Sequence, residues 1–382
     1  MLKLMSLMAL FAATLIAPKQ TQEQQENHTE GKEYKIQVAL LLDVSGSMDG
    51  LIEQAKSQLW KMVNELATSK KGGKSPNIEL ALYEYGKDTH PKAGGYIKQL
   101  VPLTTDLDLV SDKLFGLTTN GGSEFCGWAI KDAVNGLKWS KSNDDLKIII
   151  IAGNEEFTQG TVDYKKSCKT SITNGIVVNT IFCGDCDEGV RTMWKDGADR
   201  ADGKYMCINH NDKVVHVETP FDDDIVDLNT KLNKTYIAYG KKGKDKVARQ
   251  KAQDVNAGGY GKANLAERAL SKSKKNVYKN DEWDVVDAVE EKGEAALDDM
   301  DEDELPEEMK KMNKEERKEY VGKKAKEREA IQKEIQELST KRNKYIADER
   351  KKMSTGSKNT LDEVMLKAVR EQAEAKKFKF EE

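Results

Sequence analysis

The sequence predicts an α/β domain with a doubly wound, mostly parallel sheet, followed by a charged α-helical C-terminal region. From Lys35 onward, short apolar runs alternate with amphipathic stretches, which is the pattern of parallel strands joined by helical crossovers. The run LKIIIIAG at residues 146–153 is the most apolar segment after the N-terminal stretch, as expected for a strand that is buried on both faces. Beyond residue 239 the composition changes, and residues 231–382 hold 37 Lys and Arg against 33 Asp and Glu.

Each element of the domain is predicted from its own periodicity. In residues 51–66, Ile52, Leu59 and Val63 recur at helical spacing, and residues 222–239 begin with three aspartates, which a helix N-terminus favours. We therefore place the domain at residues 35–239. In chain order, its strands are expected at 35–44, 78–86, 146–153, 175–184 and 204–209, and its helices at 51–66, 107–117, 126–137, 164–174, 190–201 and 222–239.

The first residues have the composition of an export signal. Residues 1–17 are apolar from Leu4 to Ala17 with one preceding lysine, and residues 18–34 form a polar, flexible spacer. The apolar run is shorter than the roughly 20 residues that cross a bilayer as a helix. We expect a cleaved signal peptide and a periplasmic or secreted protein in an oxidising compartment. An uncleaved membrane tether is the alternative, and no other segment is apolar enough to predict a transmembrane span in the mature chain.

Charge and motif content exclude two broad classes of function. The formal net charge is -4, and both signs are mixed along the charged C-terminal region, so no basic surface for nucleic acid is predicted. The sequence shows neither a P-loop nor a supported Ser-His-Asp or Cys-His arrangement. We expect a protein that is not an enzyme.

The stretch LLDVSGSMDG places oxygen-bearing side chains at the end of an apolar strand. Asp43, Ser45 and Ser47 form D-x-S-x-S at a predicted strand-to-helix turn. Carboxylate and hydroxyl oxygens suit Mg²⁺, Mn²⁺ or Ca²⁺, whereas zinc prefers His and Cys. The loops 118–125 and 152–160 also lie beside predicted strand ends, where ligands bind in such sheets. The alternative is that the serines only cap the following helix.

This motif resembles the metal-ion-dependent adhesion site of von Willebrand factor type A domains, and the resemblance covers residues 35–235. It implies that Ser123, in NGGSEF, replaces the threonine of the family's second loop, with Thr118 and Thr119 as substitutes. The family's third loop supplies an aspartate, but Gly153 or Asn154 stands at that position here.

By this resemblance, Ser45, Ser47 and Ser123 contact the cation, while Asp43 and the third loop orient its waters. In the third loop, Asn154 would offer an amide oxygen, or Glu155 a carboxylate. The implied function is cation-dependent binding of another protein, whose carboxylate completes the metal shell. A cytoplasmic adaptor of a chaperone-type ATPase with the same fold is the alternative.

Five cysteines leave three interpretations open. They are Cys126, Cys168, Cys183, Cys186 and Cys207. A structural disulfide could join Cys183 or Cys186 to Cys207 or Cys168. The C-x-x-C spacing of CGDC also fits a thiol-disulfide oxidoreductase, and Cys207 with His210 loosely fits a zinc site.

The C-terminal region, residues 240–382, is predicted to be helical. Residues 240–263 read as a linker or an exposed helix, and Trp283 opens a small apolar stripe. A long helix is expected over 313–353, where a heptad-like seam could pack near Trp283, form a homo-oligomeric coiled coil, or leave the helix solvated. The seam residues are Ile331, Ile335, Leu338, Arg342 and Tyr345.

Overall fold

The computed structural model describes residues 33–212, 216–352 and 361–380. The predicted signal peptide and nearly all of the spacer therefore lie outside the described residues. Within the described ranges, no helix combines the length and the apolar character needed to cross a membrane.

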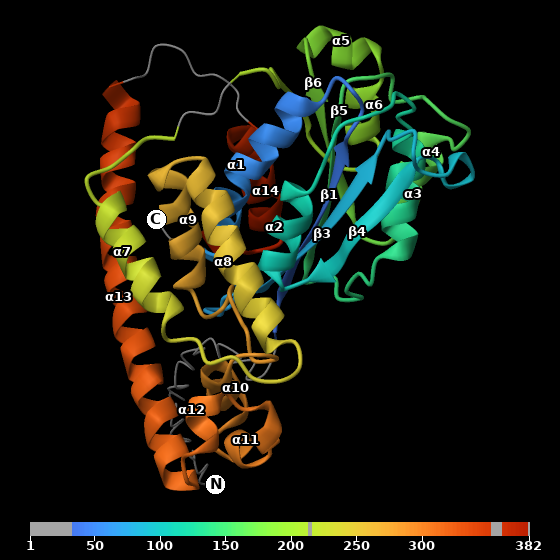
Figure 1. Ribbon diagram of the computed structural model, residues 1–382. Coiled ribbons are helices and arrows are strands. Elements are labelled where there is room, and N and C mark those ends of the chain that lie inside the picture. The colour runs from blue at the N-terminus through green and yellow to red at the C-terminus, as the bar shows by residue number, and fades with distance from the viewer. Residues whose placement is uncertain (1–32, 213–215, 353–360, 381–382) are drawn as a thin grey trace, which may run out of the picture. The chain divides into compact units, whose positions relative to one another are not determined.

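A six-stranded sheet forms the centre of the domain (Figure 1). Its strand order is β4-β3-β1-β5-β6-β7. All neighbouring strands are parallel except β4, which runs antiparallel to β3. The predicted mostly parallel α/β fold is confirmed. The strands are β1 (Lys35–Asp43), β3 (Asn77–Tyr85), β4 (Ile97–Thr104), β5 (Leu146–Gly153), β6 (Val177–Cys183) and β7 (Tyr205–Ile208).

The edge strand β4 is the one member of the sheet that the sequence pattern does not predict. Lys98, Gln99 and Pro102 are exposed on it, so its composition lacks the apolar run of the central strands. Because β4 has a partner on one side only, a proline without a backbone N–H is tolerated there.

Helices cover both faces of the sheet, and β1 divides its side chains between two cores. Val38 and Leu40 pack with α1 (Asp49–Leu66), α2 (Leu107–Phe115) and α14 (Leu361–Ala375). Ala39 and Leu41 pack on the opposite face with α3 (Cys126–Gly136), α4 (Tyr164–Thr173) and α6 (Trp194–Asp199). Burial on both faces explains why residues 38–42 of β1 form an uninterrupted apolar run.

Two predicted helices are shorter than expected. The helix predicted at 190–201 is divided into α5 (Cys186–Arg191) and α6, because Met193 between them has a left-handed φ of 71°. The helix predicted at 222–239 ends as α7 (Asp222–Asn233). The chain then extends, and Tyr239 N–H donates to the Trp283 carbonyl at 2.8 Å.

The C-terminal region packs on the α/β domain through helices and through a short second sheet. β2 (Ser69–Lys70) pairs antiparallel with β8 (Lys379–Phe380). Two 3₁₀ turns, η1 (Lys92–Gly94) and η2 (Glu302–Glu304), complete the elements. The remaining helices are α8 (Gly243–Gly259), α9 (Lys262–Lys272), α10 (Val285–Lys292), α11 (Ala295–Asp298), α12 (Glu307–Lys310) and α13 (Lys314–Lys352).

A buried arginine joins this region to the α/β domain. The Arg268 side chain in α9 is fully buried and lies over the Trp60 ring of α1, 4.5 Å from the ring centroid. Its guanidinium donates to Asp108 in α2 at 2.7 Å and also pairs with Asp254 in α8. One side chain thus connects four helices. Its removal would leave two carboxylates buried beside α9.

The apolar seam of α13 is used within the chain. Ile331 and Ile335 are buried against α7 and α9, and Leu338 is partly buried beside them. Arg342 pairs with Asp222 and Glu267. The interpretation of α13 as a solvated helix is therefore wrong. Self-association through the C-terminal helices stays a prediction.

We expect Arg268→Ala to lower the free energy of unfolding by about 3–5 kcal/mol, because buried Asp108 would lose its pairing cation and Asp254 would keep only Lys272 as an ion-pair partner. Urea denaturation followed by circular dichroism measures this. The matched control is Arg200→Ala, since Arg200 pairs with Asp196 on the surface and its loss should barely move the midpoint. Equal shifts for both variants would contradict the role given to Arg268.

Candidate metal site

Three loops meet at the carboxyl end of β1. β1 lies between β3 and β5 and is parallel to both. The turn after β1 is fixed to the loop before α3 by two backbone bonds, from Gly46 N–H to the Gly121 carbonyl at 3.1 Å and from Asn120 N–H to the Val44 carbonyl at 2.8 Å. The loop after β5 reaches the same turn. The structure therefore brings together the three loops that the sequence singles out.

Asp43 lies at the centre of this arrangement. Its side chain is fully buried, and its Oδ1 accepts a hydrogen bond from Ser45 N–H at 2.7 Å. Its Oδ2 is buried without a hydrogen-bond partner among the described residues. Burial raises the pKa of Asp43, and hydrogen bonds from Ser45 offset part of that rise. A buried carboxyl oxygen without a partner is costly.

The two serines lie beside Asp43 and do not cap the following helix. Ser45 is buried, Ser47 is exposed, and their hydroxyl oxygens are 3.4 Å apart. The N-cap residue of α1 is Met48, and no side-chain hydrogen bond caps this helix. The interpretation of the serines as helix caps is therefore wrong.

The second loop is anchored through Ser123, whose backbone pairs with Gly86 at the end of β3. The two threonines considered as substitutes have other partners. The Thr119 hydroxyl donates to the Asp49 carboxylate, and the Thr118 hydroxyl accepts from Lys87 Nζ at 2.9 Å.

The third loop departs from the family pattern for a steric reason. A Cβ atom at Gly153 would lie 2.5 Å from the Tyr85 hydroxyl and 2.9 Å from Asp43 Oδ2. The Tyr85 hydroxyl is held in place by donating to the Ala152 carbonyl at 2.8 Å. Any side chain at position 153, including aspartate, would meet these atoms.

Asn154 is the third-loop residue that contacts the turn. Its Nδ2 donates to Ser47 Oγ at 3.1 Å, while its Oδ1 is buried without a hydrogen-bond partner among the described residues. Glu155 is exposed and accepts a long hydrogen bond from Gln159 at 3.4 Å.

Glu124 belongs to this site, and sequence reasoning did not identify it. Only 3% of Glu124 is exposed, and its Oε2 has no hydrogen-bond partner among the described residues. Burial, and then the charge of Asp43, raise the pKa of Glu124. The two carboxyl side chains lie close together, since a Cβ at Gly86 would be 2.9 Å from Asp43 Oδ1 and 3.0 Å from Glu124 Cγ. Glutamate is usually exposed, so the order Gly-Gly-Ser-Glu gave no signal of this burial.

The chemistry of the site fits a hard divalent cation. Three buried oxygens without partners come from the three loops: Asp43 Oδ2, Glu124 Oε2 and Asn154 Oδ1. Hydroxyl groups of Ser45 and Ser47 lie among them. Within the described residues, no group of three or more His, Cys, Asp or Glu side chains could hold a metal alone. Hydroxyl and amide oxygens would therefore have to contribute, as they do for Mg²⁺ and Ca²⁺.

The sequence of the sheet and its loops matches one family. The family model of the von Willebrand factor type A domain matches residues 37–203. Residues 37–203 form a von Willebrand factor type A domain. The match includes the D-x-S-x-S turn, Ser123 and Asn154, so every predicted site residue lies within the type A domain.

Solved structures with similarity to the type A domain include three bacterial proteins. BatB, a conserved hypothetical protein from Bacteroides thetaiotaomicron, is 17% identical with a TM-score of 0.35, covering 45% of this chain and 90% of that one. An aerotolerance-related membrane protein from Bacteroides fragilis is 18% identical with a TM-score of 0.30, covering 46% and 93%. The pilus adhesin SpaC from Lactobacillus rhamnosus GG is 11% identical with a TM-score of 0.36, covering 47% and 28%. A search of curated proteins found no match.

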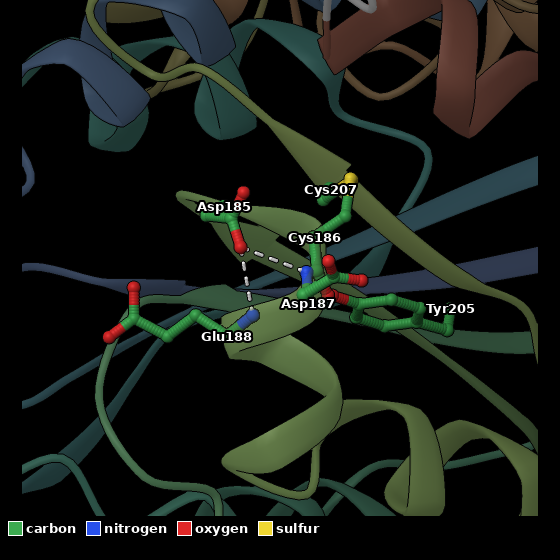
Figure 2. Close-up of a disulfide and its surroundings, with 6 residues drawn as sticks. All are labelled: Asp185, Cys186, Asp187, Glu188, Tyr205 and Cys207. Carbon is green, nitrogen blue, oxygen red and sulfur yellow. Dashed lines mark hydrogen bonds between the residues drawn. A yellow bond between two sulfur atoms is a disulfide. The ribbon is translucent and has the colours of Figure 1, made fainter.

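The cysteines form one disulfide at the edge of the sheet, between Cys186 within the matched residues and Cys207 just beyond them. Cys186, at the start of α5, is bonded to Cys207 in β7, with their Cα atoms 5.4 Å apart (Figure 2). Asp185 caps α5 by accepting from the N–H groups of Asp187 and Glu188, both at 3.0 Å. This pairing is one of the predicted disulfides. It also occupies the Cys207 sulfur that the zinc interpretation required, so that interpretation is wrong.

The other cysteines are buried thiols. Cys126, Cys168 and Cys183 are free, and burial raises the pKa of each. Cys183, the first cysteine of CGDC, lies in the core of the sheet and is not bonded to Cys186. The redox pair expected for a thiol-disulfide oxidoreductase is therefore not formed.

We expect Gly153→Ala to destabilise the type A domain by about 1–3 kcal/mol, because the added methyl group would overpack against Tyr85 and Asp43. Thermal and urea unfolding measure the change. Gly122→Ala is the matched control, since a Cβ at Gly122 meets no atom within 4 Å. An unchanged stability for Gly153→Ala would show that the loop after β5 can move aside.

Peptide mapping without reduction should recover Cys186 linked to Cys207. The other three cysteines should react with a thiol reagent only after unfolding. Replacing Cys207 with Ser should cost about 2–4 kcal/mol of stability, because the bond closes a loop across 21 residues. A recovered Cys183–Cys186 peptide would contradict this pairing and restore the oxidoreductase alternative.

Proposed function

We propose that the type A domain binds another protein through a divalent cation at the carboxyl end of its sheet, and that the protein acts after export. The observation that supports this most directly is the set of three buried oxygens without partners, one from each loop, beside the D-x-S-x-S turn. Structural polar groups in a folded protein normally have partners. A bound cation would be the partner of these three oxygens.

In this proposal Ser45, Ser47 and Ser123 hold the ion through their hydroxyl oxygens. Asp43 and Asn154 orient its waters. When bound, Mg²⁺, or Mn²⁺ or Ca²⁺ in its place, supplies a positive centre at which a carboxylate of the partner protein replaces a water. Ser47 is exposed, which gives a partner access to this part of the site.

We propose a binding role and not an enzymatic one. Coordinating a partner carboxylate requires neither a nucleophile nor a general base. The three free thiols are buried, and burial raises the pKa of each, so thiolate chemistry is disfavoured.

Export is supported by the disulfide between Cys186 and Cys207, because such bonds persist in oxidising compartments. The rival location is the cytoplasm, where a type A domain could act as an adaptor of a chaperone-type ATPase. N-terminal sequencing of the protein isolated from its cells distinguishes the exported from the cytoplasmic location. A start within the spacer favours export, and an intact Met1 in the cytosol favours the rival.

The C-terminal helices are proposed to serve docking or self-association. Because the apolar side of α13 is already covered by α7 and α9, such contacts would have to use its exposed, charged side.

Isothermal titration calorimetry of the metal-stripped protein with Mg²⁺, Mn²⁺ and Ca²⁺ should detect one site. Ser45→Ala should weaken that binding at least about tenfold, because a ligand oxygen is lost from the first turn of the site. Absence of binding for all three ions would refute the proposal.

Ser57→Ala provides the control. Ser57 is also a buried serine, but its hydroxyl bonds to the Gln54 carbonyl within α1, so metal affinity should not change. With immobilised protein, partner capture from an extract of the source cells should require the ion, be released by EDTA, and be lost in Ser45→Ala only.

A further inference from the structure

Glu124 is the acidic side chain of this site whose role the proposed ligand set does not explain. It follows Ser123 directly and precedes α3. It is buried although it carries a carboxyl group, and its Oε2 has no hydrogen-bond partner among the described residues. No basic side chain is paired with it in the described part of the chain. A structural role alone would leave this oxygen unsatisfied.

Gly86, which lies opposite Glu124, leaves room for the Glu124 side chain because it has no Cβ atom. Gly86 has a φ of +86°, and a Cβ there would lie 3.0 Å from Glu124 Cγ and 2.9 Å from Asp43 Oδ1. A larger residue at this position would separate the two acids. The chain thus has a glycine where the Glu124 and Asp43 side chains approach each other.

The third loop of the site also lacks the negative charge of the aspartate that the resemblance to type A domains leads one to expect. Tyr85 and Asp43 exclude any side chain from position 153, and Asn154 is neutral. Two acids remain as sources of the missing charge. Glu155 is exposed on the loop rim, whereas Glu124 is buried beside Asp43.

We propose that the Glu124 carboxylate is a direct ligand of the cation and replaces the carboxylate that the third loop cannot supply. This inference rests on the proposed metal site. The negative charge then comes from the second loop, next to Ser123, and reaches the ion from the side of β3. With Asp43, it balances the two positive charges of the ion before any partner arrives. Ligand charge strongly influences the affinity of such sites.

The test is calorimetric titration of Mn²⁺ and Ca²⁺ into metal-stripped Glu124→Gln, Glu155→Gln and Ser45→Ala. Glutamine keeps the size of the side chain and removes the charge. We expect Glu124→Gln to weaken binding at least about tenfold. Glu155→Gln removes an equal charge from the exposed rim and should weaken binding less than about threefold, because solvent screens it.

A second measurement separates a ligand from a merely structural residue. In EDTA, Glu124→Gln should melt at the same temperature as the unaltered protein or higher, because one of two adjacent buried acids is neutralised. On adding Ca²⁺ or Mn²⁺, the unaltered protein should gain thermal stability and the variant should gain much less.

The two proposals fail in different ways. If Ser45→Ala weakens binding but Glu124→Gln binds as tightly as Glu155→Gln, the role given to Glu124 is wrong and the metal site stands. A lower melting temperature in EDTA with unchanged affinity would likewise make Glu124 structural. If the unaltered protein binds no ion, the proposed function fails, and the inference fails with it.

Discussion

The buried carboxyl group of Asp43 is the constraint on which the rest of the site depends. It ends the central strand of a sheet that is covered on both faces, so solvent cannot satisfy it. The neighbouring residues are arranged around it. Gly86 and Gly153 leave space on two sides, Ser45 donates its N–H from the following turn, and a second acid, Glu124, lies next to it. Two adjacent buried acids are unfavourable without a cation or a proton, which makes this edge of the sheet the most chemically demanding part of the molecule.

The sequence predicts the central part of the fold well because burial on both faces leaves a strong signal. β1 contains the apolar run of residues 38–42 and β5 the run of residues 148–152, and the amphipathic helices between the strands follow from their spacing. The signal weakens where burial is partial. β4 is a half-exposed edge strand with Pro102, and the break between α5 and α6 depends on one left-handed residue, Met193. Neither feature has a distinctive pattern of residues in the sequence.

The candidate site was predictable only in part. The D-x-S-x-S turn could be found because its residues are adjacent in the chain and follow an apolar strand. Two other features depend on contacts between residues far apart in sequence. Tyr85 limits position 153 through its hydroxyl group, and Glu124 becomes buried because β1 and β3 bring Asp43 and Gly86 beside it. A single sequence does not record such contacts, so the exclusion of aspartate and the second acid became visible only in three dimensions.

The position of α14 has a consequence for the order in which the protein can fold. This helix begins at Leu361, yet Met365 and Val369 pack on the same face of the sheet as Val38 and Leu40. Gln372 adds a hydrogen bond to Asn179 in β6. Because the chain is synthesised from its N-terminus, this part of the core stays uncovered until Leu361–Ala375 has left the ribosome. Completion of the native state is therefore a late, long-range event, and an intermediate with an open apolar face must persist until α14 docks.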